Sequence, residues 1–398
     1  MASKLPHIFT ILIALSLLCP AGATQVRPKK EKAVIDSLKS ESIEYRKHGR
    51  LEQSNSILED LLQNYKLSKR VKKDVFHGLA INGLLSDDYR AYCHYAELAY
   101  GVSDFYRPLA EIPQQVAERP EDDFSVEFVV DSLFVNGNGE YRGGLIRIPV
   151  CIGGKQEWIL LDNGTAHYSV TSESFAEKHG IRILDSKSKA TGSTGAKTAF
   201  QMGYADSLSV GGLIFRNLIF AILPDSALEN PDIEVSAILG ANFFRLAGEM
   251  HFLNDERRIV FPAHQEDRES NLTMNSDDQH FAQVVVLGDT LRLQLDLGAT
   301  NTNLNASFYK RNKKRIQDLY TKGVKTSVGV GRIREADVYL ANDLTFSACG
   351  GTFTKELTAI ETMDMGDGID DFGKLGVDFL LSFDKAVINL KKMFLYVE

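Results

Sequence analysis

The sequence has few cysteines, one tryptophan and no excess of positive charge. Its 398 residues include 4 cysteines, and 45 lysines and arginines are outnumbered by 53 aspartates and glutamates, for a formal net charge of −8. The scattered cysteines supply neither a disulfide framework nor the ligand spacing of a metal site. The acidic balance excludes the positive field that attracts nucleic acid. A single tryptophan also gives no support for a carbohydrate-binding surface.

Long apolar runs are absent after the first two dozen residues. Residues 1–23 combine a lysine near the start, an apolar run over residues 8–18 and small residues at 21–23, which predicts a secretory signal peptide. We expect no membrane-spanning helix after it. Leu18 is too bulky for a good lipoprotein cleavage site before Cys19, so lipid anchoring at Cys19 is the less favoured alternative.

Three glycosylation sequons begin at Asn163, Asn271 and Asn305. At two of them a bulky glycan would cover a loop that is a functional candidate. The sequence therefore favours export to a bacterial periplasm or cell surface over a eukaryotic secretory route.

Helical periodicity extends through the first hundred residues. It predicts helices over 51–65, 71–85 and 87–100, the last with Ser86 as its N-cap, within a helical hairpin domain over 33–105. The segment "YRKHGRLEQSNSILEDLL" weakly resembles the helix junction of a tetratricopeptide repeat, but no second copy follows at the repeat period. The role of this domain is open among a prosegment, a membrane-proximal stalk and a unit that binds a protein partner.

The character of the chain changes after the helical part. Proline and an acidic cluster interrupt the periodicity and predict a linker over 106–123. Beyond it, short runs of Val, Ile, Phe and Leu alternate with Gly, Asn and Asp, which is typical of β structure. A polar stretch at 264–278 predicts a second linker between two β regions, 124–263 and 279–398.

Two Asp-X-Gly motifs occupy corresponding places in these β regions. "LLDNGTA" contains Asp162 and "QLDLGAT" contains Asp296, 134 residues later. The first motif alone predicts only a hairpin turn. Three more pairs of glycine-containing segments follow in the same order, and their glycines lie 136 to 139 residues apart: 190–195 with 327–331, 211–213 with 350–352, and 238–244 with 374–380. Preserved order and spacing indicate a tandem repeat of one unit.

The three segments that recur in order in each unit, Asp-X-Gly, the glycine-rich segment and Leu-Gly, each predict a local structure. An apolar strand that ends in Asp-X-Gly presents a carboxylate at a turn, where glycine permits close backbone approach. The glycine-rich segment about 30 residues later predicts a hairpin that can bend over a cleft. The Leu-Gly pair about 80 residues after each Asp suits a place where another backbone passes tightly against a strand.

These paired motifs resemble those of aspartic proteases of the retropepsin and pepsin type. The resemblance covers residues 124–398 and implies a mainly β, two-lobed acid-protease-like β-barrel fold from a tandem duplication, preceded by a small α-helical domain. It implies an endopeptidase that cleaves a polypeptide substrate without metal or cofactor. Its catalytic pair would be Asp162 and Asp296, sharing a proton and activating a water. Its flap candidates would be Gly192, Ser193, Thr194 and Gly195 in the first lobe, and Gly329, Val330 and Gly331 in the second.

The residue after each aspartate departs from the Thr or Ser of the family. Asn163 still offers a donor and an acceptor, but Leu297 offers neither, so the reciprocal lock between the two loops cannot form as it does in the family. Thr165 is expected to donate to the Asp162 carboxylate. The residues predicted to support the two loops are Asn163, Gly164, Thr165, Leu297, Gly298 and Thr300. The alternative is a catalytically inactive relative that binds a peptide or partner without cleaving it.

Overall fold

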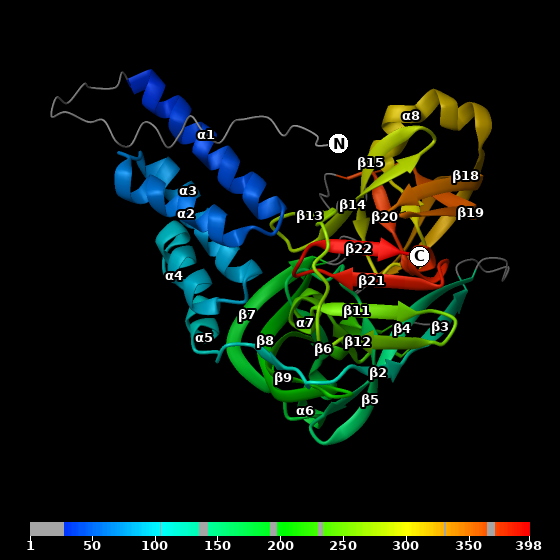
Figure 1. The fold of residues 1–398 in the computed structure, drawn as a ribbon, viewed down its shortest axis with the longest axis horizontal. Coiled ribbons are helices and arrows are strands. Elements are labelled where there is room, and N and C mark those ends of the chain that lie inside the picture. Colours follow the sequence, from blue (N-terminus) through cyan, green and yellow to red (C-terminus); the bar gives the residue numbers. More distant parts are fainter. Residues whose placement is uncertain are drawn as a thin grey trace, which may run out of the picture.

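The computed structural model describes residues 28–103, 105–134, 142–191, 197–229, 234–329, 332–363 and 371–398 (Figure 1). Its helices are α1 (Pro28–Lys47), α2 (Leu51–Asn64), α3 (Lys69–Leu85), α4 (Tyr89–Tyr100), α5 (Tyr106–Ala110), α6 (Glu173–Lys178), α7 (Ala241–Ala247), α8 (Ala306–Leu319) and α9 (Val377–Leu381). A short 3-10 helix spans Asp225–Ala227. In the part of the chain that the structure describes, no helix is both long and apolar enough to cross a bilayer.

The strands form three sheets, and the chain is mainly β after its helical part. The first lobe contains β1 (Val116–Glu118), β3 (Val129–Phe134), β4 (Arg142–Ile152), β5 (Lys155–Leu161), β6 (Ser169–Ser172), β7 (Arg182–Thr191), β8 (Lys197–Val210), β9 (Leu213–Leu223) and β10 (Ala237–Leu239). The second lobe contains β13 (Leu272–Met274), β14 (His280–Val286), β15 (Asp289–Leu295), β16 (Asn303–Leu304), β17 (Thr321–Gly329), β18 (Arg332–Ala348), β19 (Gly351–Glu361) and β20 (Gly373–Leu375).

A third sheet, the bridging sheet, joins the two lobes. Its order is β2 (Phe124–Glu127), β12 (Arg258–Phe261), β11 (Glu249–Leu253), β21 (Lys385–Asn389) and β22 (Phe394–Val397). The central pair is antiparallel, with His251 of β11 opposite Val387 of β21. Figure 1 shows these strands stacked between the green first lobe and the yellow-to-orange second lobe. The bridging sheet therefore fixes how the two lobes face each other.

The two lobes pair their strands in the same way. Strand β5 lies parallel to β10 with Leu160 opposite Ile238, and β15 lies parallel to β20 with Leu295 opposite Leu375. Strand β6 is parallel to β9, as β16 is to β19. Each lobe also contains a long antiparallel hairpin, β7–β8 and β17–β18. The sequence segments that correspond in order thus occupy corresponding places in the fold.

Alternating burial explains why the strands form where they do. In β4, Ile146, Ile148, Val150 and Ile152 are all buried at every second position, as expected of a strand with one face in a core. Removing each such side chain from water stabilises the fold by about 1.5–3 kcal/mol. Since the same residues join one continuous core with those of the second lobe, the lobes are packed together rather than loosely tethered.

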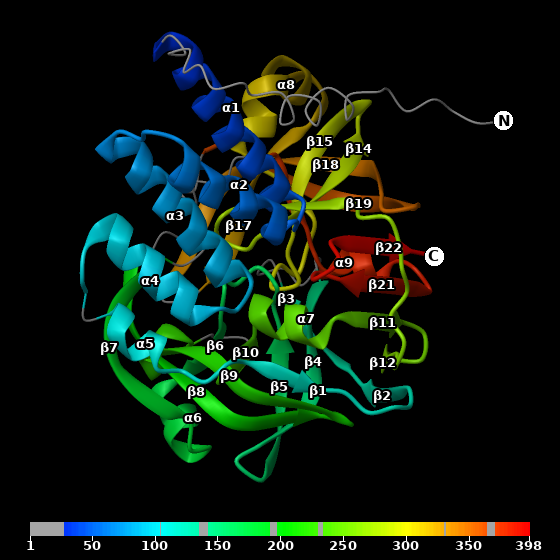
Figure 2. The same ribbon diagram turned by 60° about the vertical axis from the view of Figure 1, so that its left-hand side comes forward.

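Helices α1–α4 pack against one another and against both lobes (Figures 1 and 2). Tyr89 and Cys93 of α4 share an apolar cluster with Met202 and Ile219 of the first lobe. The turn after α1 approaches the connection between β21 and β22 of the bridging sheet so closely that a Cβ on Gly49 would lie 2.6 Å from Cγ of Met393. The helical part is therefore continuous with the protein interior.

The N-cap predicted for the last helix is wrong. The side chain of Asp88 accepts a hydrogen bond of 2.9 Å from the Ala91 N–H group, and α4 begins after it. Ser86 instead ends α3, where its backbone N–H donates to Asn82 and Leu84 carbonyl oxygens. Asp88 takes the cap because its carboxylate is one turn ahead of an otherwise unpaired N–H group.

Both stretches predicted to be linkers contain regular structure. Residues 106–123 include α5 and β1, and Ala117 of β1 lies opposite Phe215 of β9. Residues 264–278 include β13, in which Thr273 lies opposite Phe281 of β14. These short polar segments become strands because each covers the edge of a neighbouring strand, a tertiary effect that local sequence does not record.

Candidate active site

Asp162 and Asp296 follow the ends of two equivalent strands. The Asp162 N–H donates to the Leu239 carbonyl at 3.0 Å, and the Asp296 N–H donates to the Leu375 carbonyl at 3.0 Å. Each aspartate is thus anchored to the strand that carries the Leu-Gly pair of its own lobe. A turn directly after each strand leaves the carboxyl group facing the other lobe.

The glycines of the two loops bring the carboxyl groups together. A Cβ on Gly164 would lie 2.7 Å from Cγ of Asp296, and a Cβ on Gly298 would overlap the Asp162 carboxyl group. Any side chain at either position would wedge the loops apart. Each Asp-X-Gly loop therefore uses its glycine to admit the carboxylate of the opposite loop.

The two carboxyl groups lie next to each other. A Cβ on Gly164 would be 2.7 Å from Cγ of Asp296 and 3.0 Å from Oδ1 of Asp162, so both carboxyl groups flank this one glycine. Each carboxyl group also accepts from its own loop, with Gly164 N–H 2.8 Å from Asp162 Oδ1 and Gly298 N–H 3.0 Å from Asp296 Oδ1. Burial and the neighbouring Asp296 carboxylate raise the pKa of Asp162 to about 7. Asp162 therefore keeps its proton at pH values where an ordinary aspartate is ionised.

A lysine completes the immediate surroundings of the pair. Lys374 of β20 donates from Nζ to Asp296 Oδ2 at 2.6 Å, and its side chain is 23% exposed. Its sequence signal was the string "KLG", which aligns with "ILG" of the first lobe and replaces an apolar residue by a charged one. We did not predict this residue from the sequence, because the partner lies 78 positions away.

Asn163 locks the two loops from one side. Its Nδ2 donates to the Leu295 carbonyl at 2.8 Å, and its Oδ1 accepts from the Leu297 N–H at 2.9 Å, so one side chain holds the backbone on both sides of Asp296. Asn163 is fully buried, and the Leu297 side chain lies in the hydrophobic core. The lock differs from the reciprocal one of the family, since here one amide supplies both hydrogen bonds.

Replacing Asn163 by alanine is expected to loosen the site. The change leaves the Leu297 N–H and the Leu295 carbonyl buried without partners, at about 1–3 kcal/mol each. We therefore expect the free energy of unfolding, measured in urea, to fall by at least about 1 kcal/mol. Asn163→Thr is the matched control, because its hydroxyl both donates and accepts, and we expect it to retain most of that stability. Equal free energies of unfolding for Asn163→Ala and the unmodified chain would show that the lock has no role.

One hydroxyl group in each lobe binds the backbone of the Leu-Gly segment that supports the aspartate loop. Ser169 Oγ accepts from the Gly240 N–H at 3.1 Å and donates to Asn242 at 2.9 Å. In the second lobe, Thr302 Oγ1 accepts from the Gly376 N–H at 3.1 Å and donates to Asp378 at 2.7 Å. These residues were not predicted from the sequence, although Asn242 and Asp378 occupy equivalent positions of the last repeated segment.

The two predicted threonines support the loops in ways that differ from the prediction. Thr165 donates to the backbone carbonyls of Asp162 at 3.1 Å and Tyr168 at 3.0 Å, so the predicted hydrogen bond to the Asp162 carboxylate is wrong. The Asp162 carboxylate instead accepts a hydrogen bond from the Gly164 N–H, two residues further along the chain. Thr300 Oγ1 accepts from Asn301 Nδ2 at 2.9 Å.

In the sequence, the flap candidates lie between the described strands β7 and β8 and at the junction of β17 and β18. Gly192, Ser193, Thr194 and Gly195 lie outside the described residues, between Thr191 and Lys197, which are paired. Gly329 ends β17 opposite Arg332, and Val330 and Gly331 lie outside the described residues.

Among the described residues, one group has the spacing of metal ligands: Glu249, His251 and Glu266. Protein partners already engage it. His251 Nε2 lies 2.6 Å from Glu249 Oε1, the Glu266 N–H donates to Glu249 Oε2 at 2.7 Å, and Glu266 pairs with Arg268. This group lies on the bridging sheet and its connection, not at the carboxyl pair.

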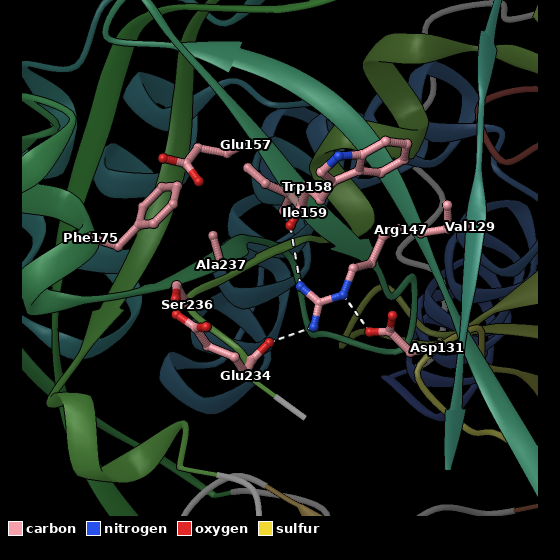
Figure 3. A pocket seen from close by; sticks show the side chains of 10 residues that line it. All are labelled: Val129, Asp131, Arg147, Glu157, Trp158, Ile159, Phe175, Glu234, Ser236 and Ala237. Carbon is pink, nitrogen blue, oxygen red and sulfur yellow. Dashed lines mark hydrogen bonds and ion pairs between the residues drawn. The ribbon is translucent and has the colours of Figure 1, made fainter. Parts of the chain in front are cut away.

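A pocket of about 710 Å³ is lined by Glu157, Trp158 and Ile159 from the middle of β5 (Figure 3). Arg147 stands in it and donates to Asp131 and to the Trp158 and Glu234 carbonyls. With its donors directed to these acceptors, Arg147 stabilises the pocket wall. The pocket contains neither member of the carboxyl pair.

The fold and the carboxyl pair together define a two-lobed, acid-protease-like protein. The family model described as aspartyl protease matches residues 148–243, which contain Asp162, the first flap region and the "ILG" segment. This part of the chain is therefore similar to aspartyl proteases. A crystal structure of a retropepsin-like aspartic protease from Rickettsia conorii is similar, with 13% identity over 37% of this chain and 94% of that chain and a TM-score of 0.21. No curated protein matches the sequence.

Proposed function

We propose that this protein is an aspartic-type endopeptidase that hydrolyses peptide bonds with a water activated by Asp162 and Asp296. The proximity of these two carboxyl groups, which lie on either side of Gly164, carries the proposal. Two adjacent carboxyl groups hold one proton between them, so that one can accept a proton from water while the other donates to the scissile carbonyl.

The surrounding structure supports the proposal. The two loops are anchored to the Leu-Gly strands, and Asn163 ties one loop to the other. Rigid support of this kind keeps reacting groups within the small tolerance that catalysis requires. The substrate would be an extended polypeptide lying between the lobes, covered by the β7–β8 and β17–β18 hairpins. The predicted signal peptide supports export, and we propose a bacterial periplasm or cell surface as the location of this activity.

A protein that binds an extended peptide without cleaving it is the second candidate. Leu297 favours it, because this residue provides no hydroxyl for the loop of Asn163 and leaves the lock one-sided. Such a protein would still use the edges of the hairpins to pair with a peptide backbone.

Cleavage of an unfolded protein substrate between about pH 3 and 8 separates these candidates. We expect peptide fragments, mapped by mass spectrometry, and incorporation of one oxygen atom from labelled water into each new carboxyl end. Asp289 is a partly exposed aspartate on β15, in the same lobe as Asp296. Asp289→Asn is therefore the matched control for a change at Asp296, and we expect it to retain full activity. Failure of the freshly purified chain to cleave at every pH would overturn the hydrolase proposal and favour the binding protein.

A further inference from the structure

Lys374 puts a positive charge on one side of a carboxyl pair that the repeated motifs would otherwise make symmetric. Its Nζ lies 2.6 Å from Asp296 Oδ2, while the equivalent position beside Asp162 is Ile238. Asp296 Oδ1 already accepts from Gly298 N–H, so both oxygens of this carboxyl group receive donors. Lys374 belongs to β20, which lies between β15 and β16, and its backbone register partners are Gln294 and Asn303.

We infer that Lys374 is a positioning residue for the proposed hydrolysis, which holds Asp296 as the carboxylate and so leaves the shared proton on Asp162. An ammonium group within hydrogen-bonding distance favours the charged form of a carboxyl group. The ion pair is largely protected from solvent, with side-chain exposures of 23% for Lys374 and 8% for Asp296, so bulk water screens it only in part. The inference rests on the proposed function.

The charged groups around the pair agree with this assignment. Besides burial, the Asp296 carboxylate raises the pKa of Asp162, and the ammonium group of Lys374 lowers it. The flanking residues of the paired strands, Gln294 and Asn303, are neutral amides. Burial is the largest cause of the raised pKa of Asp162, because it disfavours the charged carboxylate. For Asp296, the hydrogen bond from Lys374 offsets this effect directly, so we expect the shared proton to stay on Asp162.

The assignment gives each aspartate one role in a balanced reaction. The Asp296 carboxylate removes a proton from water as the water oxygen bonds to the scissile carbon, and Asp162 gives its proton to the carbonyl oxygen. The resulting gem-diol leaves Asp162 ionised and Asp296 protonated. When the carbon–nitrogen bond breaks, Asp296 protonates the departing amine and Asp162 recovers a proton from the gem-diol, which restores both groups.

Lys374→Met tests the inference through the pH dependence of kcat/KM. Without the cation, both ionisations of the pair become harder, so we expect both limbs of the pH profile to move to higher pH by about one unit, the lower end of the effect of an adjacent opposite charge. On the acid limb this shift is about a tenfold loss of rate. Lys374→Arg keeps the charge and should restore the profile. Lys39→Met is the matched control, since Lys39 pairs with Asp74 at 2.7 Å with 25% side-chain exposure, in the helical part.

A second measurement separates this inference from the proposed function. Nuclear magnetic resonance titration of ¹³C-labelled aspartate carboxyls, assigned with Asp162→Asn and Asp296→Asn, reports which group loses its proton first without requiring turnover. We expect Asp296 to ionise first in the unmodified chain, and the first ionisation to move upward in Lys374→Met. Unchanged titrations, or Asp162 ionising first, would overturn the inference even if peptides are cleaved. The expected titrations in a chain that cleaves nothing would support it while the hydrolase proposal fails.

Discussion

Asp162→Asn and Asp296→Asn should each lower kcat for peptide hydrolysis by at least about 1,000-fold, because each removes a group that transfers a proton in the proposed reaction. An amide keeps the size of the carboxyl group but can neither release nor accept the required proton. Cleavage rates at the pH optimum, measured with enzyme concentrations corrected for folded protein, check this result. Activity within tenfold of the unmodified chain for either variant would show that the pair is not the catalytic centre.

The same two variants are expected to change stability in opposite directions. The pKa of Asp162 is raised to about 7 from 3.8, so the folded chain binds a proton that the unfolded chain has lost. Stability from this group is fully present below pH 3.8 and declines as the pH rises to about 7. Asp162→Asn abolishes this loss and should stabilise the chain above pH 7 by up to about 4 kcal/mol, with little effect below pH 4.

Asp296→Asn, in contrast, deprives Lys374 of its carboxylate partner. We expect this variant to be destabilised by about 1–3 kcal/mol at neutral pH, since a largely buried ammonium loses its charged acceptor. Denaturant unfolding of both variants at pH 4 and pH 8 measures the contrast. Equal shifts for the two variants would contradict the asymmetric charge arrangement of the pair.

Arg245→Met should cost about 3–5 kcal/mol of stability, the largest effect expected outside the loops. Arg245 of α7 is buried and pairs with Asp87 at 2.6 Å and with Asp278, so that the helical part, the first lobe and the second lobe meet at one guanidinium group. Removing it leaves two carboxylates buried without their cation. The free energy of unfolding from urea or guanidinium titration is the measurement.

Arg182→Met is the matched control for the Arg245 variant. Arg182 pairs with Asp206 at 2.8 Å, but both side chains are more than half exposed, so its loss should leave the free energy of unfolding nearly unchanged. If Arg245→Met does not fold, Asp87→Asn removes one charge while keeping a hydrogen-bonding group, and it should cost less than Arg245→Met. Equal costs for the Arg245 and Arg182 variants would mean that the buried junction does not stabilise the chain.

Two histidines beside this junction respond to the same charge. Burial and Arg245 lower the pKa of His167 and of His280 to about 3, so both are neutral in the folded chain. They therefore reduce stability as the pH falls from about 6.5 towards 3, where the unfolded chain binds protons that the folded chain does not. His167 belongs to this junction, and Asp162 is tuned instead by burial, Asp296 and Lys374.

The helical part is integral to this arrangement. It contributes Asp87 to the buried junction and Tyr89 and Cys93 to an apolar cluster shared with the first lobe. Cutting it away would expose that cluster and leave Arg245 with one partner fewer. The helical part therefore helps to stabilise the packing of the lobes through these contacts.

The repeated Asp-X-Gly and Leu-Gly segments specified the mainly β class and the correspondence of Asp162 with Asp296, because strand periodicity, turn glycines and spacing are local properties that survive in a linear sequence. The contacts that decide how the pair works are not local. Asn163 reaches Leu297 across 134 positions, Lys374 reaches Asp296 across 78, and Arg245 reaches Asp87 across 158.

Nothing in the composition of those residues distinguishes them from surface amides and charges. Sequence alone therefore predicted that the lock between the loops would be weakened by Leu297, whereas the structure shows one amide holding both sides of Asp296. Sequence likewise left the two aspartates equivalent. Only the tertiary structure breaks that equivalence, because it brings one ammonium group to one carboxylate and an isoleucine to the corresponding place in the other lobe.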